Sequence, residues 1–504
     1  MSDYYSYHIF YFPFRWAVPG MENKLFSEQV DMDNIPIQPY SMWERVQIDE
    51  TEKTVSVENL QEEEELFAER QYYFNFVHEA LYDIKGKEDP IIQHYERKDV
   101  KDGNAKYHIC CKDKNYELKL EALNLNLYST GVGIMSFYLR NEKENQKDES
   151  IIRDINQFGR RVMPPHCGEF DVNNRTMLAK SISIEGLYGD KDRYCDLFDY
   201  AKVKGSDVVR GLNNIWEPAG FIKSLIEDLS PTLIVNPVID DRMLVNCWYG
   251  SNELSRMIKS NLYDFINSEL WYKHVFVDDG SDTTCQNDEM RKELLKNATY
   301  KRWQKCGTLY GVSRYSLIAI TDEGFLSKQI LSTHLRTIYS RMFELVIIQR
   351  ASVLRFSEEV TKVSSLKGKD STEMSRRISS LYKEYIRFVN QIYFRTITVQ
   401  DQGIELYEML LKQLDTEEQI KELDKEIEEL NQYVTLLIDQ RRNENAERLN
   451  WYASALLPVT ILTGVFGMNK IFEGSLLKSF VLEIIVIIIL SIIAYRILSK
   501  IKRR

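Results

Sequence analysis

A stripe of small and polar side chains near the C-terminus is the feature most able to do chemistry. Positions 443, 446, 450, 453, 457, 460 and 464 follow a spacing of three and four residues, which places them on one face of a single helix. They read Asn, Ala, Asn, Ala, Leu, Thr and Gly, and the upper part falls in 451–468, which has no charged residue. Such a face on an apolar helix suits close packing of several helices around a water-filled axis.

A short motif in the same helix makes this interpretation more specific. Pro458 and Thr460 form a Pro-x-Thr pair, Gly464 follows at four residues, and the stretch ends in Gly467-Met468-Asn469. With Asn443-Glu444 fifteen residues before the proline, this pattern resembles the pore helix of the CorA family of magnesium channels.

The resemblance implies a funnel-shaped homopentamer in which five first membrane helices line the pore. Gly467, Met468 and Asn469 would form the selectivity motif, with Asn469 giving a ring of amide oxygens that meets hydrated Mg²⁺. Mg²⁺ dehydrates reluctantly, so a neutral oxygen ring selects the hydrated ion without stripping its water. The resemblance also makes Leu449 and Leu457 apolar constrictions, although packing against lipid or another helix stays open for both. The pore-lining residues that it implies are Asn443, Leu449, Leu457, Thr460 and Gly464.

The loop after the motif departs from the family pattern. Lys470 follows Asn469 directly, where the family usually has a large apolar residue, and Glu473 and Lys478 complete a loop charge of +1. In a pentamer this places about five positive charges at the mouth, which repel cations over roughly a Debye length. We therefore expect slow or conditional conduction.

The motif belongs to a two-helix membrane anchor. A first pore helix is expected at 451–469, an external loop at 470–478, a second span at 479–499 and a basic tail at 500–504. Pro458 argues against a plain tail anchor, because it frees a backbone carbonyl that lipid cannot satisfy. Residues 439–504 carry a net charge of +5 and the rest of the chain −16. Basic residues outside both spans place both termini in the cytosol and the protein in the inner membrane as a multi-pass protein.

A long helix positions the pore helix. Between Gly403 and Pro458 there is no glycine or proline. A continuous helix of about fifty residues would be roughly 75 Å long, and it would transmit a tilt of the cytosolic body to the pore. We expect a helical region over 326–450 that ends in this stalk, with an apolar heptad seam at Ile420, Leu423, Ile427, Leu430, Val434 and Leu437.

The region 1–325 is predicted to be a cytosolic α/β domain and a possible ligand sensor. Alternating and apolar runs predict its strands, and 3.6-residue periodicity predicts its helices. The strands are expected at 7–14, 116–127, 132–139 and 315–321, and the helices at 61–84, 151–161, 252–268 and 288–304, with a loop at 141–150.

The aromatic opening 9–16, the Thr130-Gly131-Val132-Gly133 turn and the size of the body are similar to the long CorA-like proteins associated with type III CRISPR systems. That resemblance implies a small nucleotide ligand, S-adenosylmethionine joined to adenylate. Arg160 and Arg161 are the candidate phosphate donors, because guanidinium forks suit phosphate; the alternative is that they cap a helix or form surface pairs. No Gly-rich phosphate loop and no nucleophile with its base is visible, so no enzyme and no nucleic-acid binding are expected.

Three functions stay open. The first is a ligand-gated antiviral effector opened by the nucleotide second messenger. The second is a constitutive Mg²⁺ or divalent-cation transporter regulated by intracellular Mg²⁺. The third is a membrane-tethered binding protein with a non-conducting pore, which the intact Asn469 disfavours.

Overall fold

The structure is a computed structural model of the 504-residue chain. It describes residues 4–21, 24–49, 60–111, 114–160, 179–189, 191–197, 218–239, 242–278, 283–364 and 371–468, with a few positions between 485 and 492. The chain divides into two compact units. The first comprises residues 1–367 and 380–427, and the second comprises 368–379 and 428–504.

The first unit is built on a single large mixed sheet. In the described residues the strand order is β11-β12-β13-β10-β1-β6-β5-β4-β7-β8, with β9 beside β1 and β2-β3 beside β5. The β10–β13 pair is parallel, and every other pair of named strands is antiparallel. The strands are β1 Ser6–Ala17, β2 Trp43–Arg45, β3 Ile92–Arg97, β4 Lys106–Cys111, β5 Lys114–Tyr128, β6 Val132–Asn141, β7 Ser181–Glu185, β8 Cys195–Leu197, β9 Ile234–Pro237, β10 Leu244–Gly250, β11 Thr299–Tyr300, β12 Leu309–Val312 and β13 Ser316–Thr321.

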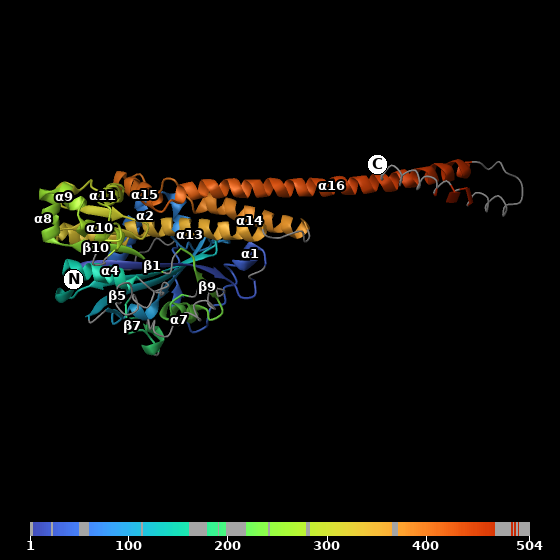
Figure 1. The fold of residues 1–504 in the computed structure, drawn as a ribbon. Coiled ribbons are helices and arrows are strands. Elements are labelled where there is room, and N and C mark those ends of the chain that lie inside the picture. The colour runs from blue at the N-terminus through green and yellow to red at the C-terminus, as the bar shows by residue number, and fades with distance from the viewer. Residues whose placement is uncertain are drawn as a thin grey trace, which may run out of the picture. The chain divides into compact units, whose positions relative to one another are not determined.

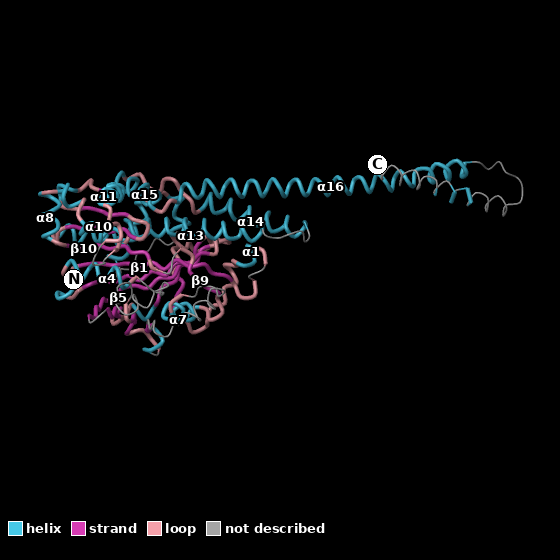
Figure 2. The backbone as a smooth tube through the Cα atoms, viewed as in Figure 1, coloured by secondary structure: helices cyan, strands magenta, loops and turns pink. Residues whose placement is uncertain are grey.

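Helices surround the sheet and continue into the second unit (Figures 1 and 2). They are α1 Phe26–Gln29, α2 Leu60–Tyr72, α3 His78–Leu81, α4 Glu149–Gly159, α7 Gly220–Leu229, α8 Asn252–Ser260, α9 Leu262–Ile266, α10 Glu269–Phe276, α11 Asp288–Ala298, α12 Ser332–Arg336, α13 Ile338–Ser364, α14 Ser371–Gln391, α15 Asp401–Gln413 and α16 Thr416–Met468. A π-helical turn at Ser327–Leu331 precedes α12.

Both faces of the central strand β1 are buried, which explains its continuous apolar sequence. On one face the Tyr11 ring meets Phe343 of α13 edge to face at 5.7 Å. On the other face Phe10 meets Tyr107, which in turn lies 6.4 Å from Phe221 of α7. The aromatic opening of the chain is therefore the core of an α/β/α arrangement.

The expected strands at 7–14, 116–127, 132–139 and 315–321 are confirmed as β1, β5, β6 and β13. The expected helix at 151–161 is confirmed as α4, which begins and ends two residues earlier than predicted. Three helix predictions were too long. The predicted helix at 61–84 ends at Tyr72, because the Phe74 backbone is extended and its N–H donates to the Ile397 carbonyl at 2.9 Å. The one at 288–304 ends at Ala298, where β11 pairs with β12.

The predicted helix at 252–268 is also interrupted. Asn261 separates α8 from α9, and its side chain caps α9 by accepting from the Asp264 N–H. The expected loop at 141–150 holds a 3₁₀ turn at Glu144–Gln146, and α4 begins within it. The Asn261 cap therefore divides a segment that the apolar periodicity predicts to be one helix.

The stalk prediction is confirmed. Helix α16 runs without interruption for 53 residues. Four of the six seam residues, Ile420, Leu423, Ile427 and Val434, are buried, and Leu430 and Leu437 are half-buried. In the first unit the Tyr385 hydroxyl of α14 lies 3.5 Å from the Ile420 carbonyl, so α14 is one of the elements that cover the seam there.

No helix in the part of the chain that the structure describes is long and apolar enough to cross a bilayer. The predicted loop at 470–478 and tail at 500–504 lie outside the described residues, as does most of the predicted second span at 479–499. The two-span anchor stays a prediction from the sequence.

A buried histidine predicts acid sensitivity of the first unit. The His8 ring lies between Ser6 Oγ, 2.9 Å from Nε2, and Asn156 Oδ1, 2.7 Å from Nδ1. Burial lowers the pKa of His8 to about 4, although the hydrogen bond with Asn156 acts in the opposite direction. The unfolded chain, with an ordinary pKa of about 6.5, binds more protons between these values. Stability therefore falls as pH decreases from about 6.5 towards 4.

We expect His8 to remove about 2 kcal/mol from the unfolding free energy between pH 7 and pH 5. Urea titrations of the full chain and of a His8→Gln variant at both pH values measure this. The variant should lose that part of the pH dependence. Equal pH dependence in both proteins would contradict the prediction.

Candidate pore helix and ligand site

The predicted pore-lining residues lie on α16, within the second unit. The stripe from Asn443 to Gly464 covers 21 residue steps, or about 31 Å of helix. Asn443, Leu457 and Thr460 are exposed, and a Cβ added at Gly464 would meet no atom within 4 Å. The described part of the chain thus presents this face without a covering element.

Residues predicted to line the pore differ in their hydrogen bonding and in their position around the helix. The Thr460 hydroxyl donates to the Leu457 carbonyl at 2.9 Å, so it is already bonded within the helix. Leu449 is 69% exposed. It lies about 100° around the helix from Asn450, and it therefore flanks the stripe while Leu457 belongs to it.

The selectivity motif lies at the limit of the described residues. Gly467 and Met468 are the last two residues of α16. Asn469, Lys470 and Glu473 lie outside the described residues. Their roles stay predictions from the sequence.

The predicted ligand residue Arg160 lies in the first unit, just after α4. Its side chain is 2% exposed, and its Nη2 donates to the Val277 carbonyl at 3.3 Å. Its guanidinium lies 5.4 Å from the ring centre of Tyr315. This burial argues against the alternative of a surface ion pair, whereas the helix-end position agrees with the capping alternative. Arg161 lies outside the described residues.

Three further arginines gather at this place, and no pattern in the sequence indicated them. Arg242 lies 4.7 Å from the ring centre of the half-buried Tyr315. Arg314 precedes that tyrosine and is exposed. Burial and the charge of Arg314 lower the pKa of Arg350, which Asp415 partly offsets. We call Arg160, Arg242, Arg314, Arg350 and Tyr315 the arginine cluster.

The arginine cluster has the chemistry of an anion site with an aromatic face. Its members come from β-strand ends and helices more than 150 positions apart in sequence, as the pair Arg160 and Arg314 illustrates. Arg160 is buried, and the members of the cluster with solvent-exposed surface are Arg242, Arg314, Tyr315 and Arg350. The Arg160-Arg161 pair in the sequence does not indicate which distant residues will lie beside it.

The fold is a mixed α/β domain followed by long helices, and α16 carries the stripe of small and polar residues. Residues 326–503 match the sequence model of a family described as CorA-like Mg2+ transporter protein. That region is therefore similar to a CorA-like Mg²⁺ transporter domain. A search of curated proteins gave no significant match.

Proposed function

We propose that the chain is a homopentameric divalent-cation channel for Mg²⁺ in the inner membrane, opened when the α/β domain binds a nucleotide second messenger. The messenger is S-adenosylmethionine joined to adenylate, and the setting is type III CRISPR antiviral defence. One observation carries the proposal: α16 is an uninterrupted helix whose first residues, 416–427, belong to the α/β unit and whose last residues carry the pore motif.

The ion pathway rests on the CorA-like domain and on the uncovered polar stripe. Five copies of the stripe would enclose an axis lined by Asn443, Thr460 and Gly464, with Asn469 at the mouth. Amide and hydroxyl oxygens suit a hydrated cation, since Mg²⁺ keeps several of its waters.

The gating part rests on the arginine cluster and on Lys470. Arg242 and Arg314 offer forks for phosphate, and Tyr315 offers a ring face for a base or a sulfonium. A lysine beside the selectivity motif opposes constant cation uptake. The arginine cluster and Lys470 are both consistent with a pore that opens only when a ligand binds.

The test is ligand-dependent flux of the full chain in liposomes. With adenylated S-adenosylmethionine, Mg²⁺ influx measured by an internal dye should rise, and without it influx should stay near the protein-free rate. Influx of equal size with and without ligand would favour the constitutive transporter. No influx in either condition would favour the tethered binding protein.

A variant pair locates the ligand. Arg242→Gln removes one charge-assisted fork, and we expect the ligand Kd from calorimetry to rise about tenfold. The matched control is Arg256→Gln, an exposed arginine of α8 that donates to the Asn252 carbonyl within its own helix. Equal effects of the two substitutions would rule out the arginine cluster as the site.

A further inference from the structure

The turn between α15 and α16, where the stalk begins, has a strained backbone. Asp415 in this turn has a φ of 56°, in the left-handed region that side chains other than glycine disfavour. Thr416, the first residue of α16, is buried, and its hydroxyl has no hydrogen-bond partner within the described part of the chain. Strain and an unbonded buried hydroxyl persist only where neighbouring contacts hold them. A contact from outside the turn must therefore stabilise it in this form.

One arginine of the arginine cluster supplies such a contact. Arg350 of α13 donates from Nη1 to the carbonyl of Leu414, the residue directly before Asp415. The neighbouring Gln349 donates to the Tyr407 hydroxyl of α15 at 3.0 Å, which anchors the middle of that helix to α13. The body of α15 is therefore fixed independently of Arg350, whereas the turn that follows it is bonded to Arg350.

A second strained turn of the first unit is also bonded to the arginine cluster. Val277 and Asp415 are the two residues other than glycine with a positive φ in the ranges that the structure describes. Val277 is β-branched and has a φ of 48°, which is rare for such a residue. Its carbonyl accepts from Arg160 Nη2 at 3.3 Å. Both strained turns thus contact arginines of one cluster, which links the state of that cluster to the backbone.

The groups around Arg350 act on its charge in opposite directions. Burial and then the charge of Arg314 lower the pKa of Arg350, whereas Asp415 and Tyr315 act to raise it. The arginine cluster and the turn therefore act on the same guanidinium. A charge-assisted hydrogen bond to phosphate is roughly twice as strong as one between neutral groups. An anion beside Arg314 would thus compete with the Leu414 carbonyl for Arg350.

We propose that Arg350 is the positioning residue that couples the arginine cluster to the stalk. A phosphate-bearing anion in the cluster draws the Arg350 guanidinium away from the Leu414 carbonyl, and the turn at Asp415 then relaxes and shifts the start of α16. The inference rests on the proposed function, because it gives the gating ligand a route to the helix that carries the stripe of small and polar residues. Helix α16 is continuous from Thr416 to Met468, so a shift of its first turn is transmitted along it.

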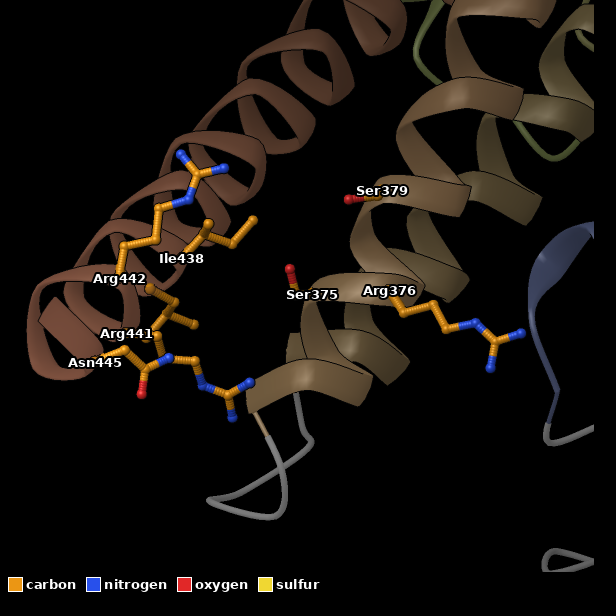
Figure 3. A pocket seen from close by; sticks show the side chains of 8 residues that line it. Ser375, Arg376, Ser379, Ile438, Arg441, Arg442 and Asn445 are labelled. Atoms are coloured by element: carbon orange, nitrogen blue, oxygen red, sulfur yellow. The ribbon is translucent and has the colours of Figure 1, made fainter. Parts of the chain in front are cut away.

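The second unit leaves room for a shift of α16. A pocket of about 480 Å³ lies between the first turns of α14 and the middle of α16. Ser375 and Ser379 of α14 face it from one side, and Ile438 of α16 lines the other (Figure 3). Close-packed interfaces resist small displacements. The pocket is a place where these two helices are not close-packed, so α16 can move there without a clash.

Hydrogen exchange of the full chain in detergent, measured by mass spectrometry, tests the coupling. The amides of Leu414 and Asp415 donate to the carbonyls of Leu410 and Lys412, so their exchange reports opening of the turn. The probes are adenylated S-adenosylmethionine and inorganic pyrophosphate, each at a saturating concentration set by calorimetry for each variant. A bound probe should raise the exchange rate of the turn about tenfold in the unaltered protein.

Arg350→Met should release the turn without a probe. Its exchange rate should lie about tenfold above that of the unaltered protein, and a probe should then raise it less than about twofold. An arginine with a merely structural role would raise the basal rate but leave the response to the probe intact. Tyr385→Phe is the matched control, because the Tyr385 hydroxyl lies 3.5 Å from the Ile420 carbonyl of α16 and is not part of the arginine cluster. Its basal rate and its response should both stay within about twofold of the unaltered protein.

Asp415→Gly serves if Arg350→Met does not fold, because glycine adopts this φ without strain. The probe should then raise exchange less than about threefold, since no strain is left to release. Unchanged exchange in the unaltered protein while a probe binds would overturn the coupling and leave the proposed function standing. A response to pyrophosphate without binding of the nucleotide would support the coupling and contradict the nucleotide ligand. No binding of either probe would overturn both.

Discussion

Replacing Asn469 by alanine is expected to lower Mg²⁺ flux at least about tenfold, because the pore loses the amide oxygens that would contact the ion's water shell. In a pentamer the change removes five oxygens at one level of the pore. Neutral oxygens at the mouth are proposed to hold hydrated Mg²⁺ without stripping it. The effect therefore belongs to the ion pathway and should leave ligand binding unchanged.

Liposome flux with an internal Mg²⁺ dye, in the presence of ligand, measures this prediction. Asn469→Gln is the matched control, since it keeps the amide and should retain more flux than the alanine variant. Lys470→Glu is the companion variant, and it should raise flux because it reverses about five charges at the mouth. Unchanged flux in Asn469→Ala would contradict the proposed role of Asn469 in selectivity. Unchanged flux in Lys470→Glu would contradict the proposal that Lys470 repels cations at the mouth.

Arg341→Met is expected to destabilise the first unit by about 3–5 kcal/mol, because it leaves buried carboxylates without their cation. Arg341 Nε lies 3.4 Å from Glu69, and Nη1 lies 4.0 Å from Glu344. Glu69 is 6% exposed and Glu344 2%. Although burial disfavours its charge, Glu69 and nearby acidic groups raise the pKa of Arg341 well above its ordinary value.

The hydrogen bonds of Glu344 show why this loss is not easily relieved. Its Oε1 accepts from the Asn126 side-chain amide and lies 3.4 Å from the Tyr128 hydroxyl. These neutral donors do not replace a guanidinium, so a charged Glu344 would remain costly. The network joins α13 to β5, and its loss should weaken the attachment of that helix to the sheet.

Urea unfolding of the full chain, followed by tryptophan fluorescence, measures the change. The double variant Arg341→Met/Glu344→Gln should recover part of the loss, because one buried charge is removed with its partner. Arg256→Met is the control for an exposed arginine and should leave the midpoint unchanged. An Arg341→Met midpoint equal to that of the control would show that the buried ion pairs contribute nothing to stability.

Much of the fold could be predicted from short-range sequence pattern. The seam Ile420, Leu423 and Ile427 repeats within a heptad, and each residue is buried in α16. The alternation in 116–120 also gave β5 correctly. These patterns depend on neighbours one to four residues away, and a single sequence contains that information in full.

The errors occurred where a distant segment decides the local structure. Helix α2 ends because Phe74 bonds to Ile397, more than 300 positions away. Thr299 and Tyr300 form a strand because β12 offers an edge. Local propensity favours helix in both places, and long-range hydrogen bonds override it.

The sequence by itself determined the long helix, its apolar seam and its stripe of small and polar residues, since all of these are periodic along one helix. Only the tertiary structure decided that Arg160 is buried against Tyr315 and that Arg242, Arg314 and Arg350 gather beside it. The physical reason is that helix periodicity fixes a direction within four residues, whereas a cluster of distant charges exists only after the sheet and its helices have packed.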